Sequence, residues 1–179
     1  MTGIEVDTNM KNELVKRCPA AESRIIQGDF FALDLRQNYF NIIYIESGLF
    51  LFTDLGNQLI FELFGFVTYD MLYNGFLKIN NALSPDGKFL IGTQGLMERV
   101  SIGENLFFNM KRHQLQSEAI RNIKYTYKRS IFQKEIILHE FTHSKPTMSY
   151  GNFLEIAQRT GFKSVRISED RQWVILSKQ

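Results

Sequence analysis

The first half of the chain carries short apolar runs separated by polar turn residues. Residues 40–45 form a continuous apolar run, which is typical of a strand covered on both faces. Residues 88–93 are predicted to be the next buried strand, directly after Ser-Pro-Asp-Gly at positions 84–87, a strong turn signal. Shorter apolar runs end near Val6 and near Gln27. The pattern therefore predicts four strands in this half of the chain.

Segments with apolar positions at helical spacing lie between these runs. Residues 9–17 place Met10 and Leu14 on one face, and Asp7 or Thr8 precedes them as a potential N-cap. Residues 58–83 keep the same spacing over a longer stretch, which predicts two helices. Alternation of strands and helices favours an α/β fold with a parallel sheet.

The second half of the chain has a different pattern. Residues 123–142 alternate and are rich in β-branched and aromatic residues, which predicts antiparallel strands. Residues 150–160 have helical spacing and stop before Gly161, a favourable end for a helix. Residues 165–168 and 172–177 then predict a terminal hairpin. The whole chain is expected to form an α/β sheet with a mixed edge.

Composition and charge exclude several classes of protein. The chain has 179 residues, 21 basic and 19 acidic, so the net charge is +2 and no nucleic-acid partner is expected. The apolar runs are shorter than the about 20 residues of a membrane span, and the acids Glu5 and Asp7 argue against a targeting peptide. The one cysteine, Cys18, excludes an internal disulfide. We therefore expect a single cytoplasmic domain over residues 1–179, with no membrane partner.

Aromatic residues crowd the segment after residues 40–45. Such residues usually pack inside, so we expect them in the core and in a lid. A substrate pocket or a dimer face is the alternative. The aromatic residues are Phe50, Phe52, Phe61, Phe64, Phe66, Tyr69 and Tyr73.

Four stretches follow one another in an order shared with a known enzyme family. They are Thr-Gly-Ile-Glu-Val-Asp-Thr-Asn-Met at residues 2–10, Ile-Gln-Gly-Asp-Phe at 26–30, the run at 40–45, and Ala-Leu-Ser-Pro-Asp-Gly-Lys-Phe-Leu-Ile at 82–91. In this order the chain resembles the class I S-adenosylmethionine-dependent methyltransferases, specifically their small-molecule branch. Residues 153–162 are similar to the last helix of that family.

The resemblance implies a fold. It is a Rossmann-like methyltransferase sheet, mostly parallel, with an antiparallel C-terminal hairpin and with the first strand and helix of the family missing. Residues 95–149 would be an insert within this domain that covers the substrate.

The resemblance also implies an S-adenosylmethionine site at the strand ends. Glu5 matches the acid that accepts both ribose hydroxyls, with Val6 and Met10 beside the adenine. Asp29 would accept the adenine amino hydrogens, and Phe30 would lie beside the base. Each acid also has a plain structural interpretation. Glu5 would be a solvated strand-end acid next to a helix cap, and Asp29 part of a Gly-Asp turn.

The end of the strand at residues 40–45 is the expected place of the methyl donor. Ile45 and Glu46 would face it across the crevice in which ligands bind in such sheets. Glu46 would orient an amine substrate, contact the ammonium group of the ligand, or be an exposed loop acid. Methyl transfer needs alignment in a dry site more than a catalytic side chain. Glu46, His143 and Tyr150 are the catalytic candidates, with His143 as a general base.

One diagnostic element of the family has no counterpart in the sequence. A Gly-x-Gly-x-Gly turn after the first strand of the family wraps the methionine half of the ligand. By resemblance, that strand would lie in mid-sheet between the strand ending at Glu5 and the strand at residues 40–45. Three outcomes are open. The two strands pair directly, another chain or a second copy supplies the strand, or the sequence is an N-terminally truncated version of a longer protein, which is the outcome we favour.

A rival motif lies further along the chain. His139, Glu140 and His143 fit the His-Glu-x-x-His pattern of zinc hydrolases, in which one helix presents both histidines to the metal. The residues before His139 favour a strand, and Pro146 would stop a helix. We therefore expect no metal site here.

The sequence therefore predicts methyl transfer from S-adenosylmethionine to an unidentified small molecule. A catalytically inactive, methyltransferase-like binding protein is the alternative, because the glycine turn is missing. Zinc hydrolysis through His139, Glu140 and His143 is the third possibility.

Overall fold

The computed structural model describes residues 2–45, 50–54, 59–63, 67–95, 100–103, 106–114, 123–133 and 136–178. Within these residues, no helix has the length and apolarity that a membrane span requires.

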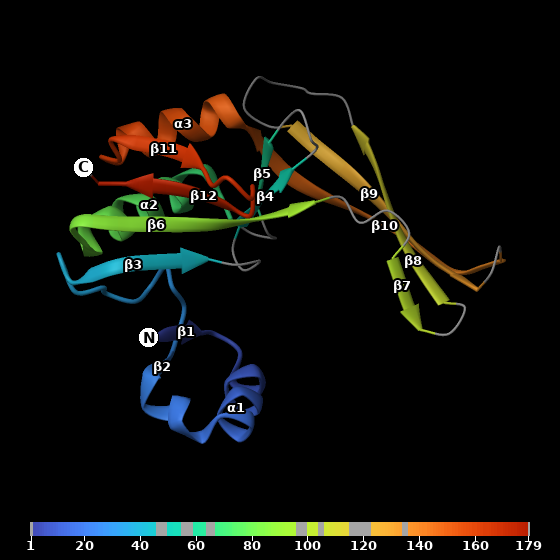
Figure 1. Cartoon of the computed structure of the whole chain (residues 1–179), viewed down its shortest axis with the longest axis horizontal. Coiled ribbons are helices and arrows are strands. Elements are labelled where there is room, and N and C mark those ends of the chain that lie inside the picture. The colour runs from blue at the N-terminus through green and yellow to red at the C-terminus, as the bar shows by residue number, and fades with distance from the viewer. Residues whose placement is uncertain are drawn as a thin grey trace.

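A small unit forms the N-terminal part of the molecule (Figure 1). It contains β1 (Gly3–Glu5), α1 (Thr8–Arg17), a 3-10 helix (Pro19–Arg24) and β2 (Ile25–Gln27). The two strands pair in parallel, with Glu5 opposite Gln27. Asp7 caps α1, because its side chain accepts hydrogen bonds from the backbone N–H groups of Asn9 and Met10. The predicted strands and helix of this segment, and the cap at Asp7, are confirmed.

The remaining strands form one larger sheet. Its order is β11-β12-β6-β4-β5-β10-β9-β8-β7, and β3 pairs with β6. The strands are β3 (Phe40–Ile45), β4 (Phe50–Asp54), β5 (Leu59–Leu63), β6 (Leu83–Gly95), β7 (Val100–Gly103), β8 (Leu106–Gln114), β9 (Ile123–Gln133), β10 (Ile136–Ser149), β11 (Ser164–Ile167) and β12 (Trp173–Ser177). The helices are α2 (Tyr69–Ala82) and α3 (Tyr150–Arg159).

The sheet is mixed, which corrects the prediction of a mostly parallel one. Among the described strands, three pairs are parallel, β1–β2, β3–β6 and β4–β6. The other seven pairs are antiparallel. Short connections permit only antiparallel neighbours, and β7 to β10 follow one another closely in the chain. The predicted antiparallel strands at residues 123–142 and the terminal hairpin are confirmed.

Residues 59–63 are a strand, whereas the sequence predicted that helices begin at residue 58. The segment pairs with β4 on one side and with β10 on the other. A segment of five residues, apolar except for Glu62, is too short to fix a period, so pairing on both sides decides its conformation. The helix expected downstream is confirmed as α2, which Thr68 caps through a hydrogen bond from the backbone N–H of Met71.

The turn predicted at residues 84–87 interrupts the β3–β6 ladder. Leu83 pairs with Phe40, and the ladder resumes where Lys88 pairs with Ile42. Four residues of β6 therefore oppose one residue of β3, which is a large bulge. A Cβ atom on Gly87 would lie 2.8 Å from the Cβ atom of Leu83, so this close turn requires glycine.

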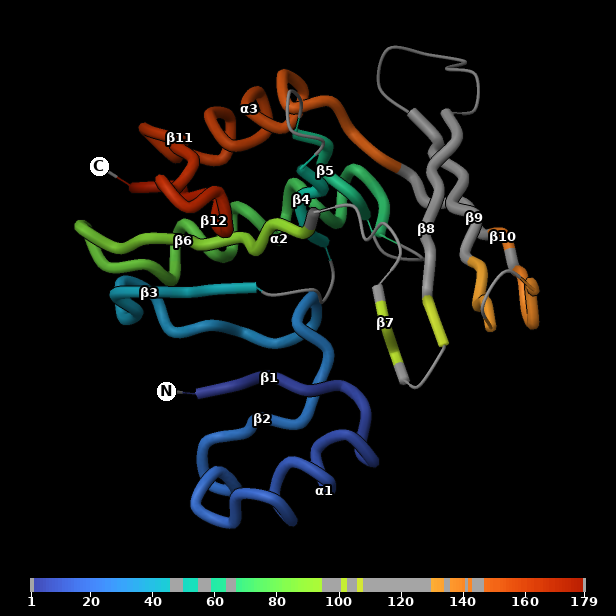
Figure 2. Tube along the Cα trace, turned by 45° about the vertical axis from the view of Figure 1, so that its right-hand side comes forward, coloured from blue at the N-terminus to red at the C-terminus, as the bar shows by residue number. Residues whose placement is uncertain are grey.

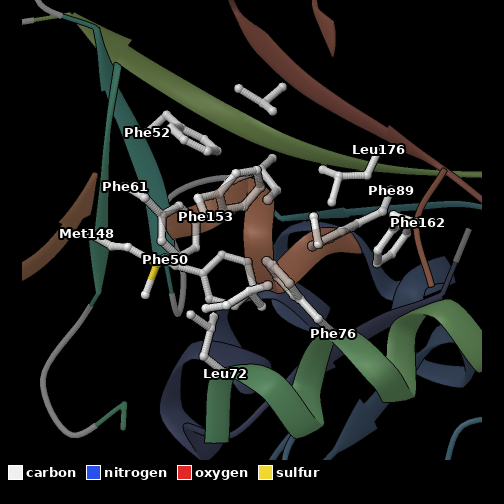
Figure 3. Packing of buried hydrophobic residues seen from close by; sticks show 14 of the residues in the cluster. Phe50, Phe52, Phe61, Leu72, Phe76, Phe89, Met148, Phe153, Phe162 and Leu176 are labelled. Carbon is white, nitrogen blue, oxygen red and sulfur yellow. The ribbon is translucent and has the colours of Figure 1, made fainter. Parts of the chain in front are cut away.

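The core lies between one face of the sheet and helices α2 and α3. Figure 3 shows rings from β4, β5, β6 and both helices meeting there. Phe76 of α2 contacts Phe89 of β6 and Phe153 of α3, with ring centroids 5.6 and 5.7 Å apart. The expectation that the aromatic residues pack inside is confirmed for Phe50, Phe52 and Phe61, which are buried. Phe64 and Phe66 lie outside the described residues.

The opposite face of the sheet carries apolar side chains that are exposed in part, together with the exposed Lys88, which is paired with Ile42. Ile42 is 60% exposed, and Tyr44 is exposed beside Trp173, with ring centroids 6.4 Å apart. The ladders place Leu90 and Ile175 on this same face, because Tyr44 is paired with Leu90 and Leu90 with Ile175. No helix in the described part of the chain covers it. The prediction that residues 40–45 are covered on both faces is therefore wrong for the chain as described.

The N-terminal unit lies beside β3 of the larger sheet. In both views β1 and β3 run in the same direction, and the segment that follows β2 passes between them in projection (Figures 1 and 2). No ladder joins β1 to β3 in the described residues. The β1–β2 pair and the β3–β6 pair are thus two separate parallel pairs.

Candidate functional site

Two acidic residues lie at the ends of neighbouring strands in the N-terminal unit. Glu5 is the last residue of β1, and Asp29 lies two residues beyond the end of β2. The backbone N–H of Gly28 donates to the carbonyl oxygen of Glu5 at 3.0 Å, and the Gln27 side chain donates to the carbonyl oxygen of Val6 at 2.7 Å. The structure therefore brings the carboxyl ends of two parallel strands together at the point where the sequence predicted it.

The carboxylate of Glu5 also has a local structural role. Its Oε1 atom accepts a hydrogen bond from the backbone N–H of Asp7 at 2.9 Å, just before α1. Glu5 is half-buried. The structural interpretation of Glu5 placed it next to a helix cap, and Asp7 is that cap. A carboxylate has acceptor capacity for more than one donor.

Asp29 begins a single tight turn. Its Oδ1 atom accepts from the backbone N–H of Phe31 at 2.9 Å, and its carbonyl oxygen accepts from Ala32 and Leu33 at 3.0 and 2.9 Å. Asp29 itself is exposed. The Gly-Asp turn of the plain interpretation is thus present, and the turn projects the carboxylate into solvent at the end of β2.

Apolar side chains beside these acids are open to solvent. Val6 is 68% exposed and Met10 is 56% exposed. Phe30 is half-buried and packs against the core. Val6 and Met10 thus add exposed apolar side chains to the part of the N-terminal unit that follows Glu5.

The residues expected around the methyl group are described only in part. Ile45 ends β3 and packs against the edge of the core. Glu46 lies outside the described residues. His143 lies in β10 with its backbone opposite Tyr127, and its side chain is outside the description.

The His-Glu-x-x-His segment is part of strand β10, as its neighbours predicted. The Oε2 atom of Glu140 accepts a hydrogen bond from the Ser130 hydroxyl of β9 at 3.2 Å. Among the described residues, no group of three metal-ligating side chains is found. The helical context of a zinc hydrolase is therefore absent from this segment.

Tyr150, the remaining catalytic candidate, is the first residue of α3. Its ring contacts Phe52 and Phe153, with centroids 6.0 and 6.1 Å away. Burial raises the pKa of the Tyr150 hydroxyl above 10.0, because the phenolate would lose solvation. The hydroxyl is therefore protonated at neutral pH and suits a hydrogen-bond donor better than a base.

The raised pKa of Tyr150 predicts a pH effect on stability. A group whose pKa is higher in the folded state stabilises the fold below its unfolded pKa, here 10.0, and this contribution is lost as the pH rises through the folded pKa. The unfolding free energy of Tyr150→Phe should therefore fall less between neutral pH and pH above 10.0 than that of the parent. Urea denaturation at several pH values measures this difference. Tyr39→Phe, at an exposed tyrosine, is the control, and equal pH profiles for Tyr150→Phe and the parent would contradict the assignment.

The structure adds contacts that no sequence pattern indicated. The Arg171 guanidinium binds the carboxylate of Asp54 through two hydrogen bonds of 2.6 and 2.8 Å, and this pairing raises the pKa of Arg171. The Thr93 hydroxyl donates to the carbonyl oxygen of Arg171. These bonds fasten the turn of the terminal hairpin to the ends of β4 and β6. Arg171 and Asp54 are 117 positions apart in the chain, so no motif or spacing in the sequence connects them.

Comparison with protein-family models and with curated proteins finds no match for the sequence. Solved structures match the fold. An amino pentose methyltransferase from Micromonospora echinaspora, bound to S-adenosylmethionine, aligns with a TM-score of 0.62 at 14% identity over 99% of this chain and 73% of that chain. The CcbJ methyltransferase from Streptomyces caelestis gives 0.59 at 12% identity, over 98% and 77% of the two chains.

A third solved structure also matches the fold of this chain. The sugar N-methyltransferase from Streptoalloteichus gives a TM-score of 0.53 at 12% identity, over 99% of this chain and 70% of that chain. At identities this low the likeness establishes the fold. The chain therefore shares the fold of these methyltransferases.

Proposed function

We propose that the chain binds S-adenosylmethionine at the carboxyl ends of β1 and β2 and serves methyl transfer to a small molecule. One observation supports the proposal most strongly. Glu5 and Asp29 lie at the ends of two adjacent parallel strands, in a chain with a methyltransferase fold. Ligands of open α/β sheets bind outside such strand ends.

The residues at this edge fit the adenosine half of the ligand. Glu5 would accept the ribose hydroxyls, and Asp29 would accept the adenine amino group. The exposed side chains of Val6 and Met10 would pack on the base, with Phe30 next to it. Bound S-adenosylmethionine would supply an electrophilic methyl group on a sulfonium ion. The acceptor must then lie in line with that group in a dry site, which places the demand on positioning.

Ile45 lies at the end of β3, and Glu46 follows it in the chain. We propose that this end of β3 faces the methyl group. Residues 95–149, which include β7 to β10, would cover the acceptor, and in Figure 1 these strands extend from the sheet beyond β5. Two structural neighbours are described as an amino pentose methyltransferase and a sugar N-methyltransferase, which supports a small-molecule acceptor.

A further strand, parallel to both, would join β1 to β3. Two features support this addition. No ladder joins β1 to β3 in the described residues. Ile42, Leu90 and Ile175 lie on the outer face of the sheet, where Ile42 is 60% exposed, and an element that covers them would remove apolar surface from water.

We propose that this further strand, a glycine-rich turn and a helix are encoded upstream of Met1. The turn would bind the methionine half of the ligand, and the helix would cover the outer face. The coding sequence upstream of Met1 tests this directly. An in-frame strand followed by Gly-x-Gly-x-Gly is expected, and an in-frame stop codon there would contradict it.

Calorimetric titration tests the proposed function. S-adenosylhomocysteine and adenosine are expected to bind the chain, since both carry the adenosine half. Homocysteine alone is expected to give no heat, because Glu5, Val6, Met10 and Asp29 would contact only the nucleoside. Absence of heat with S-adenosylhomocysteine at millimolar concentration would overturn the proposal in favour of a fold without ligand binding.

A further inference from the structure

A single ammonium group joins the turn after β2 to helix α2. The Nζ atom of Lys78 donates hydrogen bonds to the carbonyl oxygens of Phe30, Phe31 and Leu33 at 3.2, 2.7 and 2.7 Å. Lys78 lies in α2, and its side chain is half-buried. A lysine ammonium has three N–H donors and no acceptor, so these three carbonyl oxygens use its full donor capacity.

The three carbonyl oxygens belong to the turn that begins at Asp29. The N–H groups of Phe31, Ala32 and Leu33 all bond back to Asp29, so its carboxylate and its carbonyl oxygen hold the amino end of the turn. The carbonyl groups at the other end of the turn accept hydrogen bonds from the Lys78 ammonium. A cation at the carboxyl end of a helical turn is favourable for the orphan carbonyl groups and for their dipoles.

Close packing fixes the same turn from a second direction. A Cβ atom on Gly75, one helical turn before Lys78, would lie 3.2 Å from the Phe31 ring and 3.3 Å from the Phe30 ring. The Lys78 ammonium also lies over the Phe30 ring, 5.7 Å from its centroid. The turn is therefore held against one face of α2 by contacts to the rings and by hydrogen bonds to the backbone.

This contact matters because the N-terminal unit shares no ladder with the larger sheet in the described residues. The position of β1, β2 and their acids relative to Ile45 then depends on the segment that follows β2. Backbone bonds from Asn38 to Asn81 and from Tyr39 to Ala82 hold the far end of that segment at 2.9 and 2.8 Å. Lys78 holds its near end, directly after Asp29.

We propose that Lys78 is a positioning residue, which sets the place of Asp29 and Phe30 relative to the methyl-transfer end of β3. The inference rests on the proposed function, since it assigns these two residues to the adenosine. Lys78 itself touches neither ligand nor acceptor. It acts through the backbone of the turn, so its loss lowers ligand affinity without removing any ligand contact.

Lys78→Met tests the proposal, because methionine keeps an unbranched apolar side chain and removes all three donors. Lys163→Met, at an exposed lysine, is the matched control. Hydrogen exchange followed by mass spectrometry reports on the turn, and titration with S-adenosylhomocysteine reports on the site. We expect amide exchange in residues 29–33 to become about tenfold faster or more, and the affinity to fall about tenfold. Both values should stay at the parental level in Lys163→Met.

A second variant covers the case in which Lys78→Met does not fold. Lys78→Arg keeps the charge, but its planar guanidinium cannot direct three donors from one atom, so the same two effects are expected with smaller size. Unchanged exchange in residues 29–33 for a folded variant overturns the proposal. Faster exchange with unchanged affinity overturns the positioning role and leaves a structural contact. If the parent does not bind S-adenosylhomocysteine, the proposed function fails, and with it the positioning role, whatever the exchange shows.

Discussion

Phe76→Ala should lower the unfolding free energy by about 3–5 kcal/mol, the usual cost of emptying the site of a buried phenylalanine. Phe76 is fully buried and lies where α2 meets both the sheet and α3 (Figure 3). Its loss leaves a cavity that the surrounding rings cannot fill by small shifts. Chemical denaturation monitored by circular dichroism measures the effect. The rings around it are Phe50, Phe61, Phe89, Phe153 and Phe162.

Leu77→Ala is the control for this prediction. Leu77 is the next residue of α2, on its outer side, and is 39% exposed. Because alanine is a good helix former, the change should cost no more than about 1 kcal/mol. Equal losses in the two variants would show that the core is not centred on Phe76.

Glu5→Gln should weaken binding of S-adenosylhomocysteine about tenfold, with little change in stability. A hydrogen bond to a charged group contributes about 1.5–3 kcal/mol, and about 1.4 kcal/mol corresponds to a factor of ten. Glutamine keeps the size of the side chain and an oxygen that can accept from Asp7, so the start of α1 is preserved. Calorimetry gives the affinity, and thermal denaturation shows whether the fold is intact.

Glu13→Gln provides the matched comparison. Glu13 lies on α1 of the same unit and forms an exposed ion pair with Lys16 at 3.7 Å. Exposed pairs of this kind contribute little. The same loss of affinity in both variants would indicate a general effect of charge, and no loss in Glu5→Gln would remove Glu5 from the site.

The sequence predicts the elements of the N-terminal unit and the C-terminal hairpin well, because their signals are local. The cap at Asp7, the strand ending at Glu5 and the terminal hairpin all depend on residues close together in the chain. The segment at residues 59–63 shows the limit of such signals. Its apolar residues fit a helix or a strand, and the choice is made by β4 and β10, one of which lies far along the chain.

The residues of the candidate site also differ in whether local sequence signals indicate them. Glu5 and Asp29 could be proposed from the sequence, because residues 2–10 and 26–30 resemble stretches of the methyltransferases. Lys78 could not, because its partners are the backbone carbonyl groups of residues more than forty positions away. Backbone groups leave no mark in a sequence pattern. The bond between Arg171 and Asp54 escaped prediction for a similar reason, since only the folded sheet brings the two together.

A crystal structure of the chain with S-adenosylhomocysteine would show where the nucleoside binds. We expect the ribose hydroxyls to lie within hydrogen-bond distance of the Glu5 carboxylate, and the adenine to lie beside Met10 with its amino group at Asp29. A nucleoside bound elsewhere on the molecule, with solvent at the ends of β1 and β2, would contradict it.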